Sequence, residues 1–338
     1  MKHIFIYIAL LSAALCSCKN TKAIDTADTM TQPAGPTFSA DSAYAYCKAQ
    51  CDFGPRLMNT KAHDDCRDWI AQEFRRHGCT VTLQPCRLTA FDGTTLNATN
   101  IIARYTPKHL NDSTAERMLL CAHYDTRSWA DNDPDEKNHK EPVMGANDGA
   151  SGVAVMLEVA RLVSQADSAN VGIDFICFDA EDYGTPQWYE GSSVTDETWA
   201  LGSAHWAKQY AAGQTKQSNL RYGILLDMVG GIGAKFYYEG FSLEYAKPLV
   251  QKVWAAATAA GYGSYFVCSQ GGYITDDHVS VNTVAQIPCV DIIGHYPDCP
   301  QSNFGPTWHT VNDTMENISK ETLQAAGQTV IQMLYSWQ

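Results

Sequence analysis

The sequence has no cluster of basic residues. It carries 24 Lys and Arg against 37 Asp and Glu, a formal net charge of −13. Proteins that bind nucleic acid rely on positive charge to neutralise phosphates, so this composition argues against a nucleic-acid partner. The 12 cysteines include no Cys-x-x-Cys pair and no regular spacing, so they indicate no disulfide framework. Cys47 and Cys51 share one face of an expected helix, and we interpret them as buried free thiols.

Long apolar runs are absent except near the start, where residues 4–15 are almost entirely apolar. This run is too short to span a bilayer and is typical of the apolar region of a signal peptide. Leu15-Cys16-Ser17-Cys18 resembles a bacterial lipobox, so we expect Cys18 to carry lipid. An ordinary cleaved signal is the alternative. The expected location is outside the cytoplasm, as a lipoprotein facing the periplasm or the cell surface, with the lipid as its only membrane attachment.

No linker-like stretch interrupts the chain after about residue 40, although 338 residues could form one large or two modest domains. We therefore divide the chain into a leader at 1–17, a flexible polar tether at 18–38 and a single catalytic domain at 39–338.

Segments with helical apolar spacing alternate with short apolar segments typical of strands. Residues 150–164 show a helical apolar stripe, and residues 173–178 form a continuous apolar run typical of a strand covered on both faces. Helices are expected at 39–50, 63–77, 150–164, 202–212, 242–260 and 320–336, and strands at 80–88, 100–105, 118–122, 173–178, 222–226 and 289–293. This alternation predicts an α/β sandwich around a mostly parallel sheet.

Residues able to do chemistry follow the predicted strands directly. His123 and Asp125 come after 118–122, Glu181-Asp182 after 173–178, and Asp227 after 222–226. In open α/β sheets, ligands bind at the carboxyl ends of the strands. The order of these residues therefore predicts a single site.

Acidic residues and histidines of this kind are the ligands that zinc takes. The candidates are His123, Asp125, Asp148, Glu181, Asp182, Asp227, Asp277 and His309. Each residue alone has a plainer interpretation; Asp148, for example, could cap the helix that follows it. Together they would crowd up to six acids around one pocket, which is costly unless cations or shared protons relieve it. A metal is the economical explanation.

Seven segments, in order and spacing, resemble the zinc-dependent animal-type glutaminyl cyclases, which are relatives of the co-catalytic zinc aminopeptidases. The segments are MLLCAHYDTR, MGANDGASGVAVMLEVARLV, FICFDAEDYG, ALGSAHWA, ILLDMVGG, YITDDHVSVN and FGPTWHTVNDTMENI. The resemblance extends from about Ser39 to the C-terminus. It implies a three-layer α/β/α sandwich around a mixed, mostly parallel sheet, with one zinc ion held by Asp148, Asp182 and His309.

Two features favour the cyclase branch over the aminopeptidases. A Trp, Trp308, precedes the ligand His309, and the chain reads Asp276-Asp277-His278 where aminopeptidases usually read Ser-Asp-His. As alternatives, Trp308 could belong to the core and Asp277 could cap a helix. Two positions do not discriminate, because His123 and Asp227 match the second-zinc ligands of aminopeptidases but are also kept in the one-zinc cyclases.

The chain departs from the animal cyclases at two places. Glu181-Asp182 stands where they have Glu-Glu, so the shorter Asp demands a closer backbone or a shifted metal. They also have a Cys pair beside the site, and the matching Ala122 and Val153 cannot form it.

The resemblance implies conversion of N-terminal glutamine of peptides or proteins to pyroglutamate, with release of ammonia. Glu181 would move the proton, and Asp227 and Asp277 would form a hydrogen-bonded acidic pair beside it. Trp188 and Trp308 would wall the pocket. Two alternatives stay open: a zinc aminopeptidase that releases N-terminal residues, and a peptide-binding lipoprotein without catalysis.

Overall fold

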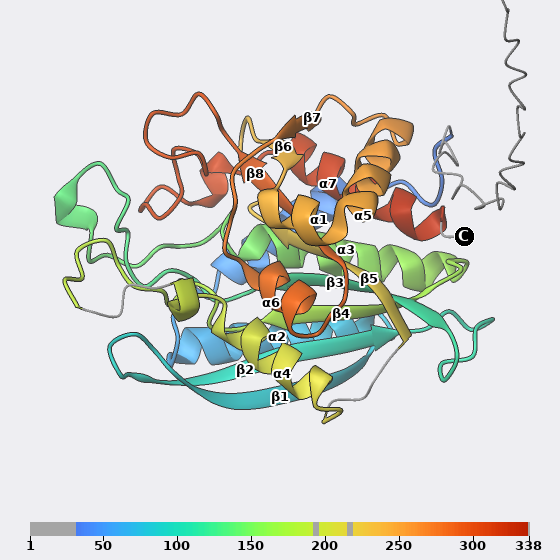
Figure 1. Cartoon of the computed structure of the whole chain (residues 1–338), viewed down its shortest axis with the longest axis horizontal. Helices are drawn as coiled ribbons and strands as arrows, with labels where there is room; N and C mark the ends of the chain where they lie inside the picture. The colour runs from blue at the N-terminus through green and yellow to red at the C-terminus, as the bar shows by residue number, and fades with distance from the viewer. Residues whose placement is uncertain (1–31, 192–195, 215–218, 337–338) are drawn as a thin grey trace, which may run out of the picture.

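An eight-stranded mixed sheet forms the centre of the computed structural model, which describes residues 32–191, 196–214 and 219–336 (Figure 1). The strands are β1 (Thr80–Thr89), β2 (Thr95–Tyr105), β3 (Glu116–His123), β4 (Gly172–Phe178), β5 (Asn219–Asp227), β6 (Lys235–Tyr238), β7 (Phe266–Gln270) and β8 (Cys289–His295). Their order is β1-β2-β4-β3-β5-β8-β6-β7. The central neighbours β4, β3, β5 and β8 are parallel, whereas β1, β2 and β6 join antiparallel.

Helices cover both faces of this sheet. They are α1 (Ala40–Cys51), α2 (Lys61–Arg76), α3 (Ala150–Ala166), α4 (Leu201–Ala211), α5 (Gly240–Ala259), α6 (Asp277–Thr283) and α7 (Lys320–Tyr335), with 3₁₀ turns η1 (Glu136–Asn138), η2 (Asp196–Thr198) and η3 (Met315–Asn317). The main apolar core lies between the sheet and α1, α2, α3, α5 and α7, and a smaller core lies under α4 and α6. The predicted three-layer α/β/α sandwich with a mixed sheet is therefore confirmed.

Burial explains why the central strands read as continuous apolar runs. Every residue of β4 is buried, because α3 packs on one face of the sheet and α4 on the other. Ser39 accepts a hydrogen bond from the Ser42 backbone N–H and so caps α1, as expected from the sequence.

Three short elements were missing from the sequence-based expectation: β6, β7 and α6. β6 and β7 have four and five residues, and α6 has seven, so each is too short to stand out as an apolar pattern in the sequence. The missing helix matters for function, because α6 begins at Asp277, beside the site.

Glycine permits two close contacts at the start of α3. Gly149 adopts φ +96°, and a Cβ there would lie 2.6 Å from the Asp125 carbonyl oxygen. A Cβ on Gly152 would lie 2.1 Å from the Leu226 carbonyl oxygen. Because glycine has no side chain at either position, α3 can approach β5 closely, and its N-terminus reaches the end of the sheet.

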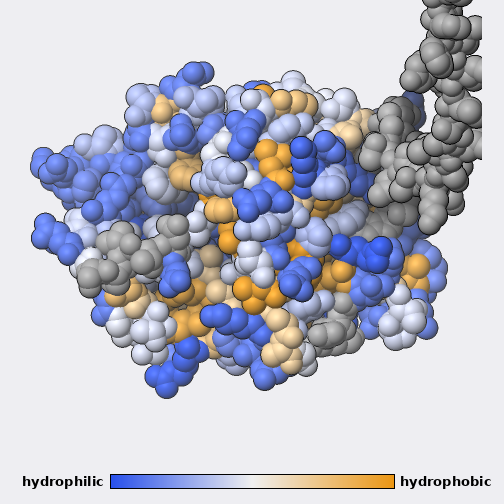
Figure 2. All heavy atoms as spheres, in the orientation of Figure 1, coloured by the Kyte–Doolittle hydropathy of each residue, from blue (hydrophilic) through white to orange (hydrophobic). Residues whose placement is uncertain are grey.

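The ten cysteines within the described residues are all free. Cys47 is buried as expected, but Cys51 is only partly buried, so the prediction of two buried free thiols is confirmed for Cys47 alone. The predicted leader, the Cys18 lipid site and most of the tether lie outside the described residues. Among the helices of the described part, none is both long and apolar enough to cross a bilayer. The face shown in Figure 2 is mostly hydrophilic, with hydrophobic groups scattered among polar ones.

Candidate metal centre

The carboxyl ends of β4, β3 and β5 bring the predicted chemical residues together. His123 is the last residue of β3, Asp227 is the last residue of β5, and Glu181 and Asp182 follow β4 within four residues. These strands are parallel neighbours, so their carboxyl ends meet at one edge of the sheet. Asp148 reaches the same edge from the residues just before α3.

Asp148, Asp182 and His309 form one compact group of donor atoms, all within 4.8 Å of one another. His309 Nε2 lies 3.2 Å from Asp182 Oδ1 and 3.7 Å from Asp148 Oδ2. Both carboxylate oxygens of Asp182 are buried, and apart from the contact with His309 they have no partner among the described residues. A buried carboxylate with so little compensation is costly, and a divalent cation between these three residues would satisfy it. The donor set therefore fits a zinc ion with an open fourth position.

His123, Asp148 and Asp227 form a second group that shares Asp148 with the first. His123 Nε2 lies 3.1 Å from Asp148 Oδ1 and 3.2 Å from Asp227 Oδ1. Asp148 thus presents one oxygen to each histidine, as a carboxylate bridging two metal ions would. The geometry provides donors for one ion or for two.

A pocket of about 310 Å³ opens onto these residues. Five acids line it: Asp148, Glu181, Asp182, Asp227 and Asp276. Its other walls are largely apolar and aromatic, formed by Met228, Tyr273, Ile274, Ile293, Phe304, Trp199 and Trp308. Such a pocket combines apolar walls with a few polar groups at one end, which is typical of a site for a small side chain.

The crowding of acids shifts their protonation. Burial, reinforced by the neighbouring Asp148, raises the pKa of Asp182 to about 6. Burial also raises the pKa of Asp227 to about 7 and that of Glu181 well above its usual range. For His309, burial lowers the pKa, but the charge of Asp182 outweighs it and brings the pKa to about 8.

The expected acidic pair needs correction at one residue. The pocket is lined by Asp276 and not by Asp277, which is fully buried, and no hydrogen bond joins Asp227 to Asp277 among the described residues. Asp276 is the N-cap of α6 in an extended conformation, and Asp277 is the first helical residue. Two adjacent acids before an unpredicted helix gave no signal for which one faces the pocket.

One of the two Trp residues expected in the pocket wall also needs correction. Trp308 lines the pocket as predicted, but Trp188 does not; it is 38% exposed and packs against Trp129 and His139. Trp199 takes the wall position, with its ring stacked on that of His309 at 5.9 Å. Trp188 was expected in the pocket from the family resemblance, but the loop after Asp182 places it outside.

Two buried acids hold the backbone of the candidate ligands. Asp125 accepts hydrogen bonds from the Glu181 and Asp182 backbone N–H groups, each at 3.1 Å. Asp313 accepts from the Asp148 backbone N–H at 3.0 Å, and burial raises its pKa to about 8. The sequence pointed to Asp125 as part of the cluster, but it gave no sign of Asp313.

Backbone strain also concentrates at the site. Ala180, Met228 and His309 adopt φ values of +53°, +47° and +53°, which side chains rarely occupy. Each lies in or beside the residues that carry the donors, as expected where surrounding structure imposes a functional geometry.

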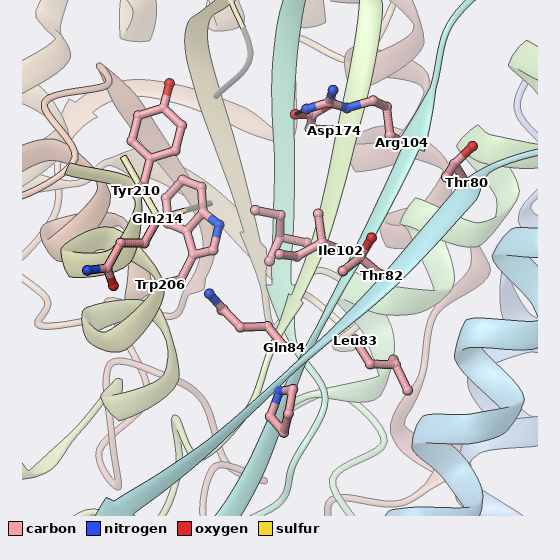
Figure 3. Close-up of a pocket in the computed structure, with 12 residues that line it drawn as sticks. Thr80, Thr82, Leu83, Gln84, Ile102, Arg104, Asp174, Trp206, Tyr210 and Gln214 are labelled. Atoms are coloured by element: carbon pink, nitrogen blue, oxygen red, sulfur yellow. Dashed lines mark hydrogen bonds and ion pairs between the residues drawn. The ribbon is translucent and has the colours of Figure 1, made fainter. Parts of the chain in front are cut away.

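A second hollow of about 350 Å³ lies away from this centre, between α4 and the strands β1, β2 and β4 (Figure 3). Trp206 and Tyr210 from α4 face Ile102, Thr82 and Gln84 across it. Asp174, the acid among its lining residues, is paired with Arg104 and Arg117. Among the described residues that line it, this hollow therefore offers no group of metal donors.

Comparison with known proteins agrees with this fold. Residues 100–334 match Peptidase family M28. A solved structure of Bacteroides thetaiotaomicron glutaminyl cyclase bound to N-acetylhistamine is 50% identical, with a TM-score of 0.84, and the match covers 90% of this chain and 100% of that one. A Zn-dependent exopeptidase from Parabacteroides distasonis is 48% identical, with a TM-score of 0.83 and the same coverage.

A curated relative, Aminopeptidase YwaD of Bacillus subtilis, is 31% identical over 256 residues. The match takes in 74% of this chain but only 46% of the aminopeptidase, so the chain spans about half the length of that relative. The family match covers well over half of the chain and includes every candidate metal ligand, from His123 to His309. The chain belongs to Peptidase family M28.

Proposed function

We propose that this protein is a zinc-dependent glutaminyl-peptide cyclotransferase, which converts N-terminal glutamine of peptides or proteins to pyroglutamate and releases ammonia. One observation carries the proposal. The position that reads Asp in the cyclases and Ser in most aminopeptidases is the first of Asp276-Asp277-His278, and Asp276 is the residue that lines the pocket with Glu181. The high similarity to a Bacteroides glutaminyl cyclase along that whole chain supports it.

The pocket suits a glutamine side chain. Trp308, Trp199 and Phe304 would contact its methylene groups, and the donor cluster lies in the same pocket. When bound by Asp148, Asp182 and His309, zinc supplies Lewis-acid polarisation of the γ-carboxamide carbonyl. The pocket's main task is then to hold the substrate's own α-amine near the γ-carbon, because an intramolecular attack gains most from orientation.

Glu181 is the group placed to move the proton. It would accept a proton from the attacking α-amine and return one to the departing amide nitrogen, acting as base and then as acid. Its pKa is raised, mainly by burial and also by the charges of Asp276 and Asp182, which favours a group that can hold a proton and then release it. Asp276, whose pKa burial also raises, can keep a proton and donate a hydrogen bond within the pocket.

A zinc aminopeptidase is the second candidate. It is favoured by the complete second donor group of His123, Asp148 and Asp227 and by the similarity to the Bacillus aminopeptidase. The same Glu181 would then activate water rather than the substrate amine. A binding protein without catalysis is less favoured, because both donor groups are complete and Glu181 is in place.

For location, the proposal is export as a lipoprotein anchored by lipid on Cys18. The apolar run at 4–15 and Leu15-Cys16-Ser17-Cys18 support it. The substrates reached there would be exported peptides and proteins with N-terminal glutamine.

Purified protein loaded with zinc should convert a Gln-initiated peptide to its pyroglutamyl form and leave a leucine anilide intact. Mass spectrometry of the peptide and absorbance of released aniline measure the two reactions on one sample. Zinc content measured in parallel should be about one ion per chain. Efficient release of N-terminal residues, with two zinc ions and no ring closure, would establish the aminopeptidase instead.

Replacing Glu181 with Gln should lower kcat for cyclisation by at least about 100-fold, the lower range for loss of a general acid–base. Zinc content should stay at the wild-type level, because Glu181 belongs to neither donor group. Steady-state kinetics and elemental analysis of the same preparation provide the check. Activity within a few-fold of wild type would remove Glu181 from this role.

Asp276→Asn and Asp277→Asn separate the two adjacent acids. The Asp276 variant should lose at least about tenfold in kcat, because a pocket carboxyl next to Glu181 is removed. The Asp277 variant should affect the melting temperature more than kcat, because this residue is buried outside the pocket. Kinetics and thermal unfolding on both proteins test this, and the reverse order of effects on kcat would return the role to Asp277.

Zinc affinity should rise between pH 6 and pH 8. With pKa values of about 6 for Asp182 and about 8 for His309, the metal-free site holds protons over this range that zinc must displace. For each proton that zinc displaces, the zinc dissociation constant should fall by up to about tenfold for each unit that the pH rises. Competition with a chelator, corrected for the chelator's own protonation, measures the slope. An affinity independent of pH would show that the ligands are already deprotonated.

A further inference from the structure

A buried arginine lies behind the candidate metal ligands. Arg127, 1% exposed, follows β3 by four residues in the loop that leads toward α3. Its Nη1 donates hydrogen bonds to the backbone carbonyls of Asp182, at 3.0 Å, and Gly184, at 2.8 Å. Its guanidinium also lies 4.6 Å from the centre of the Trp199 ring, which stacks on His309. Arg127 therefore contacts the backbone of one candidate ligand, Asp182, and the aromatic ring stacked on another, His309.

Asp131 connects Arg127 to His309. Its Oδ1 and Oδ2 accept from Arg127 Nε at 3.1 Å and Nη2 at 2.7 Å, a bidentate pair. Asp131 Oδ1 also lies 3.4 Å from His309 Nδ1, while His309 Nε2 faces Asp182 and Asp148. A carboxylate on one ring nitrogen fixes the tautomer, so the other nitrogen presents its lone pair toward the metal position.

The residue after Asp131 holds the His309 backbone. The Asn132 backbone N–H donates to the His309 carbonyl at 3.0 Å, and Asn132 Nδ2 donates to the Trp308 carbonyl at 3.2 Å. His309 has φ +53°, a conformation that costs free energy unless its surroundings impose it. The loop therefore fixes both the main chain and the ring of His309.

We propose that Arg127 and Asp131 are positioning residues of the zinc centre. Arg127 holds Asp131 and the Asp182 backbone in one rigid unit, and Asp131 orients the His309 imidazole. The inference rests on the assignment of Asp182 and His309 as zinc ligands, but it does not depend on which reaction the centre performs.

A matched control exists elsewhere in the same sheet. Arg117 and Asp174 form a second buried pair, with side chains 1% and 5% exposed and Arg117 Nε 2.5 Å from Asp174 Oδ1. Arg117 also donates to two backbone carbonyls, those of Tyr105 and Ile173. Breaking either pair leaves a buried charge and should destabilise the fold comparably. Only the Arg127–Asp131 pair contacts candidate ligands.

The experiment compares Asp131→Asn and Arg127→Lys with Asp174→Asn and Arg117→Lys in the full chain. Zinc dissociation constants come from chelator competition without substrate at one fixed pH, and melting temperatures come from the chelated and zinc-loaded forms. Loss of a hydrogen-bond partner of a metal ligand costs about 10–100-fold in affinity, so the first two variants should show that loss. The control variants should melt at lower temperature while binding zinc as wild type does.

Zinc affinity within about twofold of wild type in the Asp131 and Arg127 variants would overturn the proposal and leave the pair a purely structural role. If Asp131→Asn does not fold, Arg127→Lys, which keeps a cation in the same place, is judged by the same criterion. Because the readout is zinc binding, a wild-type protein that bound zinc but failed to cyclise Gln-peptides would contradict the proposed function alone.

Discussion

The confinement of many carboxylates at one sheet edge is the constraint on which the rest of the site depends. Five acids line one pocket, and each is at least nine-tenths buried. Without compensation, their mutual repulsion and lost hydration would oppose folding. The structure provides compensation of three kinds: raised pKa values for several of these acids, the Asp277 backbone N–H directed at Asp276, and a donor set that a divalent cation would satisfy.

A second group of acids builds the support around the first. Asp313 accepts from the Asp148 backbone, Asp125 accepts from the Asp182 backbone, and Asp131 faces the His309 ring. The backbone or ring of each candidate ligand is therefore held by a buried carboxylate that belongs to neither donor group. Such an arrangement makes the ligand geometry rigid before metal binds, and it also makes the metal-free protein costly to fold, so metal binding and stability are coupled.

The sequence allowed prediction of the reactive residues at the strand ends but not of the buried residues that hold the candidate ligands in place. His123, Glu181 and Asp227 were predictable because each follows an apolar run, and the parallel order of those runs brings them together. Arg127 and Asp131 were not, because a polar loop reads as solvated surface, and nothing in its composition shows that it folds under the site. The sequence could not show which of Asp276 and Asp277 faces the pocket. The structure shows it, because Asp276 is the extended N-cap of α6 and Asp277 is the first helical residue.

The distinction between cyclase and aminopeptidase does not lie in the metal donors. Asp148 faces both His123 and His309, so the donors for one ion are all part of a site for two. The two reactions differ in the nucleophile, which is either the substrate's amine or water. What can bias that choice is a pocket group that holds a proton and restrains the substrate's amino end, and Asp276 occupies the pocket with its pKa raised mainly by burial. A Ser there could also donate a hydrogen bond but could not serve as a titratable partner of Glu181. We therefore attribute the difference between the two reactions to the exchange of a hydroxyl for a buried carboxyl in the pocket that holds Glu181.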